Sequence, residues 1–462
     1  MDLFRKKRIG LEKTELERSL NSMDLVLLGL GSMVGTGIFT IVGPTIAKVA
    51  GPALMISIVI AAIAVALSAL IFSEFSSRIP TQGGPYGYLY VVFGEFPAWI
   101  AGCLLIGEFF TAISITASGW GGYIKSLFGL KLPTVFNGPL GSSQHFSIDL
   151  IPMLVIAIIT ALGFLSARAM LRFNNVLVIL KLTALIVFIV IGVFHLNLDN
   201  WNNFAPFGWL DPLSGNGVTA GAALMFMAFL GFETVSASAD EARYPKKTMP
   251  QGILGALFVT AILYILVTVV LTGMVNYTKL DVPDVLAFAL RSVGLTWVAN
   301  LISVVVMLTL ITVGISMAYA LVRIIYSISR DGLLPKRLSK ISGKYKVPKN
   351  ATLLMGIGAM LGSGLFPIDK LSEFLNLSTL IYLMMLSLGI IKLRRDFGTP
   401  DKGEFKVPFV PILPALSFLI SLILIIQYHW TTWLTLLILL AIISIIYFLY
   451  GYKHSKLSKM AK

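Results

Sequence analysis

The sequence has few charged residues and almost no cysteine. Only 13% of its 462 residues are Asp, Glu, Lys or Arg, whereas an ordinary soluble domain carries roughly 25%. The single cysteine, Cys103, excludes a disulfide framework. No metal-ligand spacing, phosphate-binding loop or nucleophile–base motif is present, so we expect no metal, no cofactor and no enzymatic activity.

Apolar sequence is abundant and makes up 57% of the chain. Apolar segments of about 20 residues, the length that spans a bilayer, recur from one end of the chain to the other. We identify 12 such segments and predict an all-α polytopic membrane protein with 12 transmembrane helices. The first segment is too long for a signal peptide and lacks a cleavage site, so we expect it to remain as a transmembrane helix.

The distribution of basic residues predicts the orientation. The net charge of +14 would suggest nucleic-acid binding in a soluble protein, but here the basic residues lie in short loops between apolar segments. With twelve spans, 29 of the 36 Lys and Arg residues fall on the side that holds both termini, and six fall on the other. Basic loops concentrate on the cytoplasmic side. We therefore predict a multi-pass protein of the cell (plasma) membrane with both termini cytoplasmic, surrounded by the lipid bilayer and binding no nucleic acid.

Four glycines within nine residues, from Gly29 to Gly37, interrupt the first span. Each weakens a helix by about 1 kcal/mol relative to alanine. Small residues four apart are also common where membrane helices pack closely, but Gly35-Thr36-Gly37 at mid-span favours an unwound segment. Unwound backbone is tolerated in a bilayer where it lines a cavity or binds something. Its free N–H groups suit a carboxylate and its free carbonyls suit an ammonium group, so the break predicts an α-amino acid site.

The sixth span contains a second interruption. Gly231 breaks an apolar run near mid-depth, and Glu233 and two hydroxyl residues follow it. This position, five helices after the first break, matches two five-helix repeats of inverted topology. We therefore expect helices 1 and 6 both to be broken.

Several short motifs resemble those of the amino acid–polyamine–organocation (APC) superfamily of permeases, and within it the cationic amino acid transporter branch. The motifs occur in the family's order over most of the chain: Gly35-Thr36-Gly37-Ile38-Phe39, Phe75-Ser76-Ser77-Arg78-Ile79-Pro80, Gly83-Gly84-Pro85-Tyr86, Gly231-Phe232-Glu233, Asp240-Glu241-Ala242-Arg243-Tyr244-Pro245 and Ser329-Arg330-Asp331-Gly332-Leu333-Leu334-Pro335. The resemblance implies a LeuT-type 5+5 inverted repeat and amino acid transport by alternating access.

The same resemblance divides the chain into five parts. They are a cytoplasmic N-terminal segment (1–22), a first inverted repeat of helices 1–5 (23–195), a second of helices 6–10 (219–392), peripheral helices 11 and 12 (409–451) and a cytoplasmic basic tail (452–462).

The family's substrate site also transfers to named residues. The backbone site for the carboxylate and amine falls on Ser32, Met33, Val34, Gly35, Thr36 and Gly37, and its helix 6 counterpart falls on Met227, Ala228 and Leu230. Many relatives have an aromatic gate at the position of Met227. In this chain either Phe226 or Phe229 takes that role or the gate is softer.

Two ionisable residues lie well inside the predicted spans, Glu108 in helix 3 and Lys181 in helix 5. Each costs at least about 2.5–3.5 kcal/mol at the bilayer centre on insertion scales, so we expect function at both sites. The alternatives are snorkelling to an interface or a structural buried pair. In proton-driven members of the resembled family, a lysine at this place looks like a substitute for the cation that sodium-coupled members bind. The resemblance therefore implies that protonation of Lys181 couples uptake to protons. Glu108 could contact a cationic side chain, relay a proton or orient Lys181.

Taken together, these features predict a secondary active amino acid transporter with proton-coupled uptake by alternating access. Its expected partners are an amino acid substrate and protons. An amino acid exchanger (antiporter), or a sensor that binds an amino acid without net transport, would use the same fold. The sequence leaves open whether the substrate is cationic, branched-chain or otherwise neutral, and whether a small membrane subunit is a partner.

Overall fold

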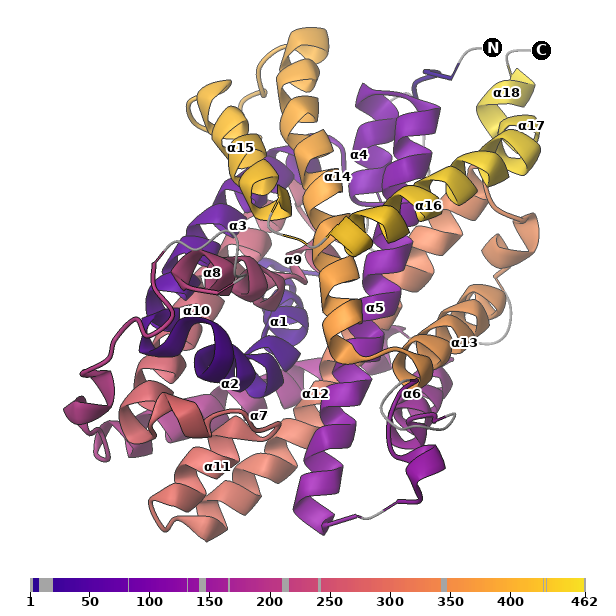
Figure 1. The fold of residues 1–462 in the computed structure, drawn as a ribbon. Helices are drawn as coiled ribbons and strands as arrows, with labels where there is room; N and C mark the ends of the chain where they lie inside the picture. Colours follow the sequence, from indigo (N-terminus) through magenta and orange to yellow (C-terminus); the bar gives the residue numbers. More distant parts are fainter. Residues whose placement is uncertain are drawn as a thin grey trace.

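The chain folds into a bundle of helices, shown as a computed structural model in Figure 1. The structure describes residues 3–7, 20–81, 83–130, 132–140, 147–164, 167–209, 216–239, 242–341, 347–426, 428 and 430–460. These ranges contain no β-strand and show β-type pairing only as isolated bridges, such as the one between Leu20 and Ala242. The all-α prediction is therefore confirmed.

Long helices form the bundle and short helices connect them. The first half contains α1 (Ser22–Met33), α2 (Val42–Thr45), α3 (Leu54–Arg78), α4 (Pro85–Val92), α5 (Glu95–Phe128), α6 (Leu150–Leu162) and α7 (Ala167–Val193). The second half contains α8 (Val218–Phe226), α9 (Phe232–Ala237), α10 (Pro245–Met274), α11 (Val285–Ser292), α12 (Thr296–Arg330), α13 (Lys349–Leu365) and α14 (Ile368–Phe397). The helices α15 (Ile412–Ile426), α16 (Trp430–Ile446), α17 (Tyr452–His454) and α18 (Lys456–Met460) follow.

The lengths and outer faces of these helices fit a membrane. Among the described residues, eight helical segments are long and apolar enough to cross a bilayer, and α6 and α15 are shorter apolar helices. One of the eight, Ser22–Arg78, contains both α1 and α3. Apolar residues such as Val176, Ile179 and Val190 on α7 are more than half exposed at helical spacing, which suits contact with lipid rather than water. The chain is a polytopic membrane protein, and the count of twelve spans stays a prediction.

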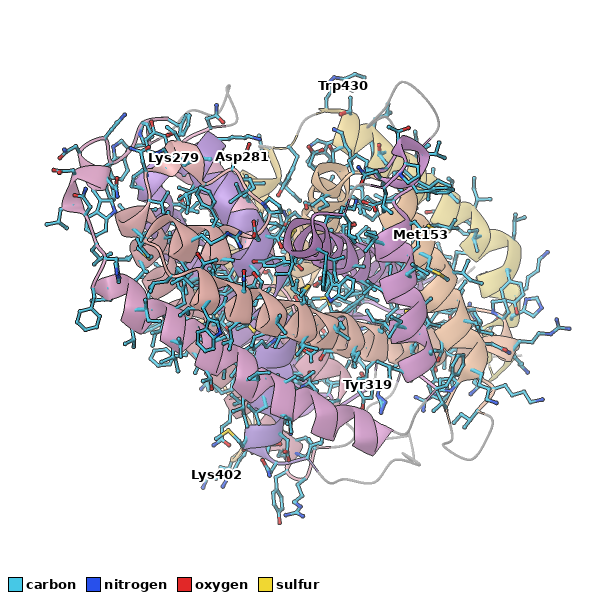
Figure 2. All side chains as sticks on the ribbon, turned by 90° about the horizontal axis from the view of Figure 1, so that it is seen from below. Met153, Lys279, Asp281, Tyr319, Lys402 and Trp430 are labelled. Atoms are coloured by element: carbon cyan, nitrogen blue, oxygen red, sulfur yellow. The ribbon has the colours of Figure 1, made fainter. Side chains whose placement is uncertain are left out.

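Charged side chains occur mainly outside the apolar helices. Lys279, Asp281 and Lys402 lie at the rim of the molecule in Figure 2. Lys279 is in a turn that follows α10, and Lys402 is in the connection between α14 and α15.

The first span is broken just after Met33, where α1 ends. Val34 is extended (φ −76°, ψ 92°), and a π-helical turn begins at Gly37. Gly29 and Gly31 lie inside α1 instead, at close contacts: a Cβ on Gly29 would lie 2.6 Å from Ala256 Cβ, and one on Gly31 would lie 2.8 Å from the side-chain oxygen of Asn174. The glycine-rich stretch therefore combines close packing in its first half with a helix break in its second.

The sixth span is broken between α8 and α9. A single 3₁₀ turn covers 227–229, Leu230 is extended (φ −66°, ψ 149°), and Gly231 has φ +122°. Glycine adopts this conformation without the steric cost that a side chain imposes. The two breaks are neighbours, because Ser32 Oγ donates a hydrogen bond to the Gly231 carbonyl at 2.8 Å. Helices 1 and 6 are broken as predicted.

Both ends of the chain bind the same two acidic residues, in an arrangement that we call the terminal clasp. Arg5 pairs with Glu95 at the start of α5 (3.3 Å), and Lys7 pairs with Asp331 after α12 (2.9 Å). From the other terminus, Ser455 Oγ donates to Glu95 at 2.5 Å, and the N–H of the next residue donates to the Asp331 carbonyl at 2.9 Å. Both termini accordingly lie at the same end of the bundle in Figure 1.

Candidate functional site

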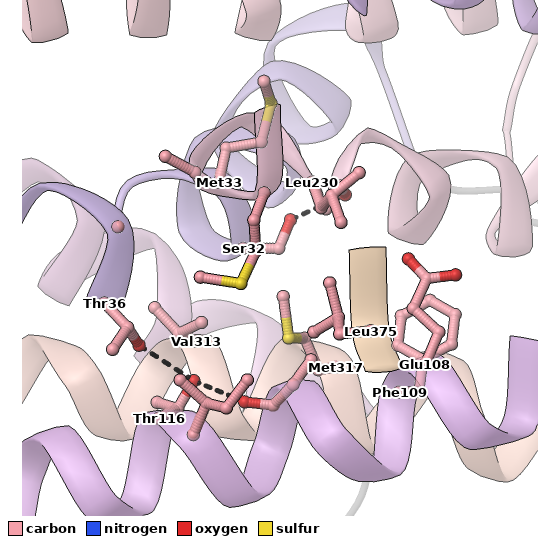
Figure 3. A pocket seen from close by; sticks show the side chains of 16 residues that line it. Ser32, Met33, Thr36, Glu108, Phe109, Thr116, Leu230, Val313, Met317 and Leu375 are labelled. Carbon is pink, nitrogen blue, oxygen red and sulfur yellow. Dashed lines mark hydrogen bonds between the residues drawn. The ribbon is translucent and has the colours of Figure 1, made fainter. Parts of the chain in front are cut away.

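A small cavity lies where the two broken helices meet α5, α12 and α14 (Figure 3). Its volume is about 40 Å³, whereas a cavity of roughly 10–15 Å³ is enough for one water molecule. A ligand larger than a few waters therefore requires the surrounding side chains to move. The lining residues are Ser32, Met33, Thr36, Gly37, Glu108, Phe109, Ala112, Ile115, Thr116, Met227, Ala228, Leu230, Gly231, Val313, Met317 and Leu375.

Most of the predicted site residues are at this cavity, and three are not. Val34, Gly35 and Lys181 are absent from its lining. Gly35 faces α12 instead, where a Cβ would lie 2.7 Å from a methyl group of Val313. The predicted residues therefore form two groups. Most of them line the cavity, and Val34, Gly35 and Lys181 lie behind the first break. Asp240 and Glu241, which belong to one of the sequence motifs, lie outside the described residues.

Lys181 stands behind the first break and binds its free carbonyl groups. Its Nζ atom donates to the carbonyl of Gly31 at 2.8 Å and to that of Val34 at 2.7 Å. The side chain is completely buried, and no carboxylate among the described residues forms a salt bridge with it. The amine of α7 thus occupies backbone acceptors that the unwinding of the first span leaves open.

Tyr264 on α10 connects the two breaks. Its hydroxyl lies 2.6 Å from the Met33 carbonyl and 2.9 Å from the Ala228 carbonyl. A phenol has one hydrogen, so it donates to one of these carbonyls at a time. Sequence reasoning missed this residue. In the sequence, a tyrosine that bridges two helix breaks looks the same as a tyrosine that only packs in an apolar core. The signal that was available is a hydroxyl at mid-depth in a span, which needs a partner.

The two breaks also share hydroxyl groups. Ser32 Oγ lies 2.8 Å from Thr234 Oγ1, and Thr234 Oγ1 donates to the Gly231 carbonyl at 2.6 Å. Gly231 allows this approach, since a Cβ there would lie 2.9 Å from the Ser32 side chain. On the opposite wall Thr36 Oγ1 donates to Thr116 Oγ1 of α5 at 3.2 Å. The first span is therefore held at both sides of its break by short polar side chains.

Two carboxylates lie beside the cavity on different helices. Glu233 accepts the Gly231 N–H at 2.8 Å and the Tyr382 hydroxyl of α14 at 3.1 Å, so it caps α9. Glu108 lines the cavity from α5, and its Oε2 atom is buried with no hydrogen-bond partner among the described residues. A buried acceptor left open in this way is available to a ligand or a water molecule.

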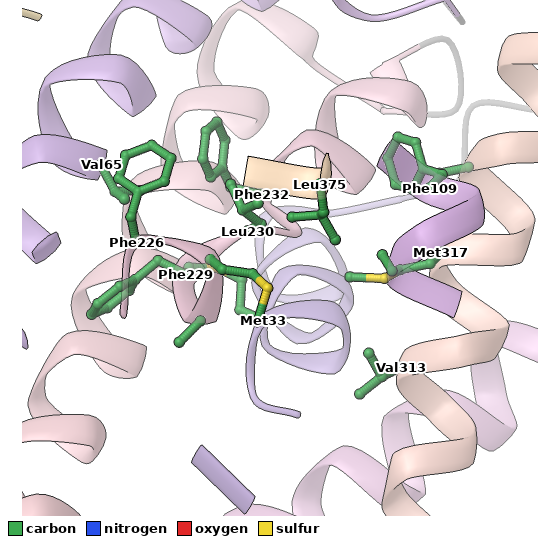
Figure 4. Packing of buried hydrophobic residues seen from close by; sticks show 14 of the residues in the cluster. Met33, Val65, Phe109, Phe226, Phe229, Leu230, Phe232, Val313, Met317 and Leu375 are labelled. Atoms are coloured by element: carbon green, nitrogen blue, oxygen red, sulfur yellow. The ribbon is translucent and has the colours of Figure 1, made fainter. Parts of the chain in front are cut away.

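The two phenylalanines named as candidates for an aromatic gate, Phe226 and Phe229, do not line the cavity. Phe226 lies beside Val65 in Figure 4, and Phe229 packs against the Tyr264 ring with the ring centroids 5.1 Å apart. Neither phenylalanine lines the cavity, whereas Met227 does. Flexible thioether side chains and the ring of Phe109 border the cavity together, and the softer gate stays a prediction.

The comparisons with known proteins agree on one family. The family model described as amino acid permease matches residues 20–450. The chain is 40% identical to the methylthioribose transporter of Bacillus subtilis (strain 168), over 88% of this chain and 89% of that protein. It is 39% identical to the branched-chain amino acid permease BcaP of the same organism, over 85% and 86% of the two chains. It is 32% identical to human cationic amino acid transporter 4, over 84% of this chain and 61% of that protein.

Proposed function

This chain belongs to the amino acid permease family, and from that premise we propose that it carries an amino acid across the cell membrane by proton-coupled alternating access. One observation carries the proposal: two helices are interrupted at the same cavity, and hydroxyl groups and backbone carbonyls bridge the two interruptions. Discontinuous helices of this kind hold substrates near the bilayer midplane in secondary transporters.

The substrate head group is proposed to bind between the two breaks. The N–H groups that begin the second half of the first span suit a carboxylate, because they lie at the positive end of a helix. Lys181 and Tyr264 already occupy several of the free carbonyls, so the ammonium group binds those that remain. The proposed contacts are Ser32, Met33, Val34, Gly35, Thr36 and Gly37 in the first span and Met227, Ala228 and Leu230 in the sixth.

The inverted-repeat organisation is part of the same proposal. Residues 23–195 and 219–392 would form the two repeats, and the breaks after Met33 and at Leu230 each fall in the first helix of a repeat. Alternating access would then move one set of helices against the other around the breaks. Both termini are proposed to be cytoplasmic, as the distribution of basic residues predicts.

Lys181 is the proposed coupling residue. It is buried, binds two carbonyls at the first break and has no carboxylate partner in the part of the chain that the structure describes. Loss of its proton would remove two charged hydrogen bonds from that break, so protonation and the shape of the substrate site are linked.

Proteoliposomes test the coupling. With an inward proton gradient, wild-type protein should accumulate substrate and need no internal substrate, whereas an exchanger would require internal substrate. Lys181→Met should abolish gradient-driven uptake, while Lys181→Arg, which keeps the charge, should bind substrate but respond weakly to pH. Unchanged proton-driven uptake by Lys181→Met would remove the proposed role.

A second candidate substrate is a methylthio sugar. The observation that favours it is the cavity wall, which combines the thioethers of Met33, Met227 and Met317 with the open acceptor of Glu108. Such a wall suits a methylthio group beside hydroxyl groups, and one relative is a methylthioribose transporter. A thermal-shift screen against the twenty amino acids and methylthioribose distinguishes the candidates, because a selective ligand raises the unfolding temperature.

A further inference from the structure

The half of the first span that follows the break is unusual in its helix type. It consists of a π-helical turn (Gly37–Ile41), the short helix α2 and a second π-helical turn (Ile46–Ala50). We call residues 37–50 the outer half of the first span, because the proposed topology places the termini on the cytoplasmic side. π-Helical turns are rare and occur frequently at functional sites. The outer half begins at the cavity, since Gly37 lines it.

One side of the outer half packs closely against α5. A Cβ on Gly119 of α5 would lie only 3.0 Å from Thr40 Oγ1. Tyr123 follows Gly119 by one helical turn, so the two residues share a face of α5. The buried Tyr123 hydroxyl donates a hydrogen bond to the Phe39 carbonyl at 2.8 Å. A side chain of α5 therefore binds the backbone of the outer half directly.

The proline that follows Phe39 limits the backbone donors available here. Pro44 has no N–H, so it cannot donate to the Phe39 carbonyl in the π-helical pattern, which joins residues five apart. The phenol of Tyr123 supplies a donor from another helix. This contact lies about 10 Å beyond the cavity along α5, because Tyr123 follows the lining residue Thr116 by seven residues at a rise of about 1.5 Å each.

The other side of the outer half is covered by residues 280–292, which include α11 and which we call the cover segment. A Cβ on Gly43 would lie 2.5 Å from the Leu280 carbonyl oxygen. Lys48 pairs with Asp281 at 2.7 Å, but this pair is largely exposed, and exposed pairs contribute little. In Figure 1, α11 and the last turns of α5 lie at the end of the molecule opposite the termini. The outer half is therefore enclosed at that end.

This closed arrangement leaves polar groups unsatisfied. Within the described part of the chain, Thr40 Oγ1 and Trp120 Nε1 are buried and have no hydrogen-bond partner. Thr40 faces α5 at Gly119, and Trp120 is the next residue of that helix. Buried polar atoms in native proteins bond to protein groups or to water, and leaving them unpaired is unfavourable. Water would satisfy both atoms if the outer half moved away from α5, so the closed arrangement opposes itself and needs a contact that holds it.

We propose that the hydrogen bond from Tyr123 to the Phe39 carbonyl is a latch, which holds the outer half against α5 and whose opening exposes the cavity at the end opposite the termini. The Val49 carbonyl accepts the N–H of Gly217, just before α8, at 2.8 Å, so the start of α8 moves with the outer half. Tyr123 is thus a positioning residue. The latch rests on the proposed transport function only for its place in the cycle, where it closes the site behind a bound substrate.

Chemical labelling of the purified protein tests the latch without any transport. In a Cys103→Ser background, Thr40→Cys should react slowly with a small charged methanethiosulfonate, because the position is buried. Adding Tyr123→Phe should raise this rate about fivefold or more, which corresponds to about 1 kcal/mol. Tyr277→Phe is the matched control, since it removes a phenol from the turn just before the cover segment, and it should leave the rate unchanged.

A second thiol position distinguishes opening of the latch from general loosening. Ser387 is buried on α14 and bonds to Ser417 of α15, so Ser387→Cys should stay unreactive when Tyr123→Phe is added. Faster labelling at both positions, together with a lowered unfolding temperature, would show general destabilisation and overturn the latch. An unchanged labelling rate of Thr40→Cys would overturn it as well.

Transport kinetics give a further readout, because the latch affects KM and kcat differently. A larger open population binds external substrate more readily, so Tyr123→Phe should lower KM. Its kcat should also fall, because closure behind the substrate is a step of the cycle. A KM that rises or stays unchanged would contradict the latch. Faster labelling of Thr40→Cys in protein that transports nothing would support the latch and contradict only the transport function.

Discussion

At the scale of single residues, Tyr264 is the side chain that ties the two interrupted helices together. Replacing it by phenylalanine leaves the carbonyls of Met33 and Ala228 without this donor, and an unpaired buried polar group costs about 1–3 kcal/mol. We expect Tyr264→Phe to weaken substrate binding by about tenfold, or about 1.4 kcal/mol. Equilibrium binding of radiolabelled substrate measures this change. Tyr277→Phe, in a surface turn, is the control, and equal affinities of the two variants would contradict the prediction.

Gly231 combines two constraints that a pair of variants separates. Its φ is +122°, and a Cβ there would approach Ser32 within 2.9 Å. A strained backbone conformation alone costs about 1–3 kcal/mol. Gly294 also has positive φ (+83°) but nothing within 4 Å of its position, so Gly294→Ala reports the backbone cost alone. We expect Gly231→Ala to lower the unfolding temperature more and to abolish binding. Indistinguishable melting curves and affinities for the two variants would show that the contact with Ser32 is unimportant.

The residue scale also shows what the sequence could and could not predict. Glu108 and Lys181 were predictable because charge is rare in an apolar span. Their surroundings were not, since the partners of Lys181 are backbone carbonyls of Gly31 and Val34, which carry no side-chain signal. Tyr264 was missed for the related reason that its importance depends on where a distant helix is interrupted.

At the scale of secondary-structure elements, the first span explains why glycine content alone is ambiguous. Gly29 and Gly31 stay helical and allow α10 and α7 to approach closely, whereas the break begins at Val34. Small residues serve either purpose in a membrane helix. Whether a glycine allows close packing or a helix break depends on the residues that surround it in the tertiary structure, and the sequence alone does not show these neighbours.

The connection between α14 and α15 should respond to acid. Glu404 pairs there with Lys246 at 3.1 Å and with Arg78 of α3 at 3.7 Å. Partial burial raises the pKa of the Glu404 carboxyl, but the Asp401 N–H and the Lys246 ammonium outweigh it and hold the pKa below its usual value of about 4.5. Because the pKa of this carboxyl is lower in the folded state, the ionised carboxylate stabilises the protein at pH values above its unfolded-state pKa. This stabilisation is lost as the pH falls through the folded-state pKa.

The unfolding temperature between pH 6 and pH 3 measures this contribution. Wild-type protein should lose stability towards the acid end of that range, and Glu404→Gln should lose less, because the variant has no carboxylate to protonate. The difference should shrink at high salt, since Lys246 is largely exposed and its charge is screened. Parallel pH profiles for the two proteins would show that the pair contributes nothing.

At the scale of the whole molecule, the orientation is the property most easily checked. The distribution of basic residues predicts that the connection carrying Lys402 faces the cytoplasm and the turn carrying Lys279 faces outward. In a Cys103→Ser background, a membrane-impermeant maleimide should label Lys279→Cys in intact cells and Lys402→Cys only after permeabilisation. Both positions are exposed, so accessibility to the reagent is decided by the membrane. The reverse labelling pattern would invert the proposed topology.

The terminal clasp has a consequence for how the protein is made. Glu95 is buried, and its partners include Arg5 from the beginning of the chain and Tyr447 and Ser455 from near its end. During synthesis the helix that begins at Glu95 enters the membrane long before residues 447–455 exist. Arg5 and Tyr90 precede Glu95 in the chain, so the carboxylate lacks two of its four side-chain donors until residues 447–455 have been made. A chain that stops before residue 447 would therefore leave this buried carboxylate with half of its hydrogen-bond donors, a local polar defect in an otherwise apolar bundle.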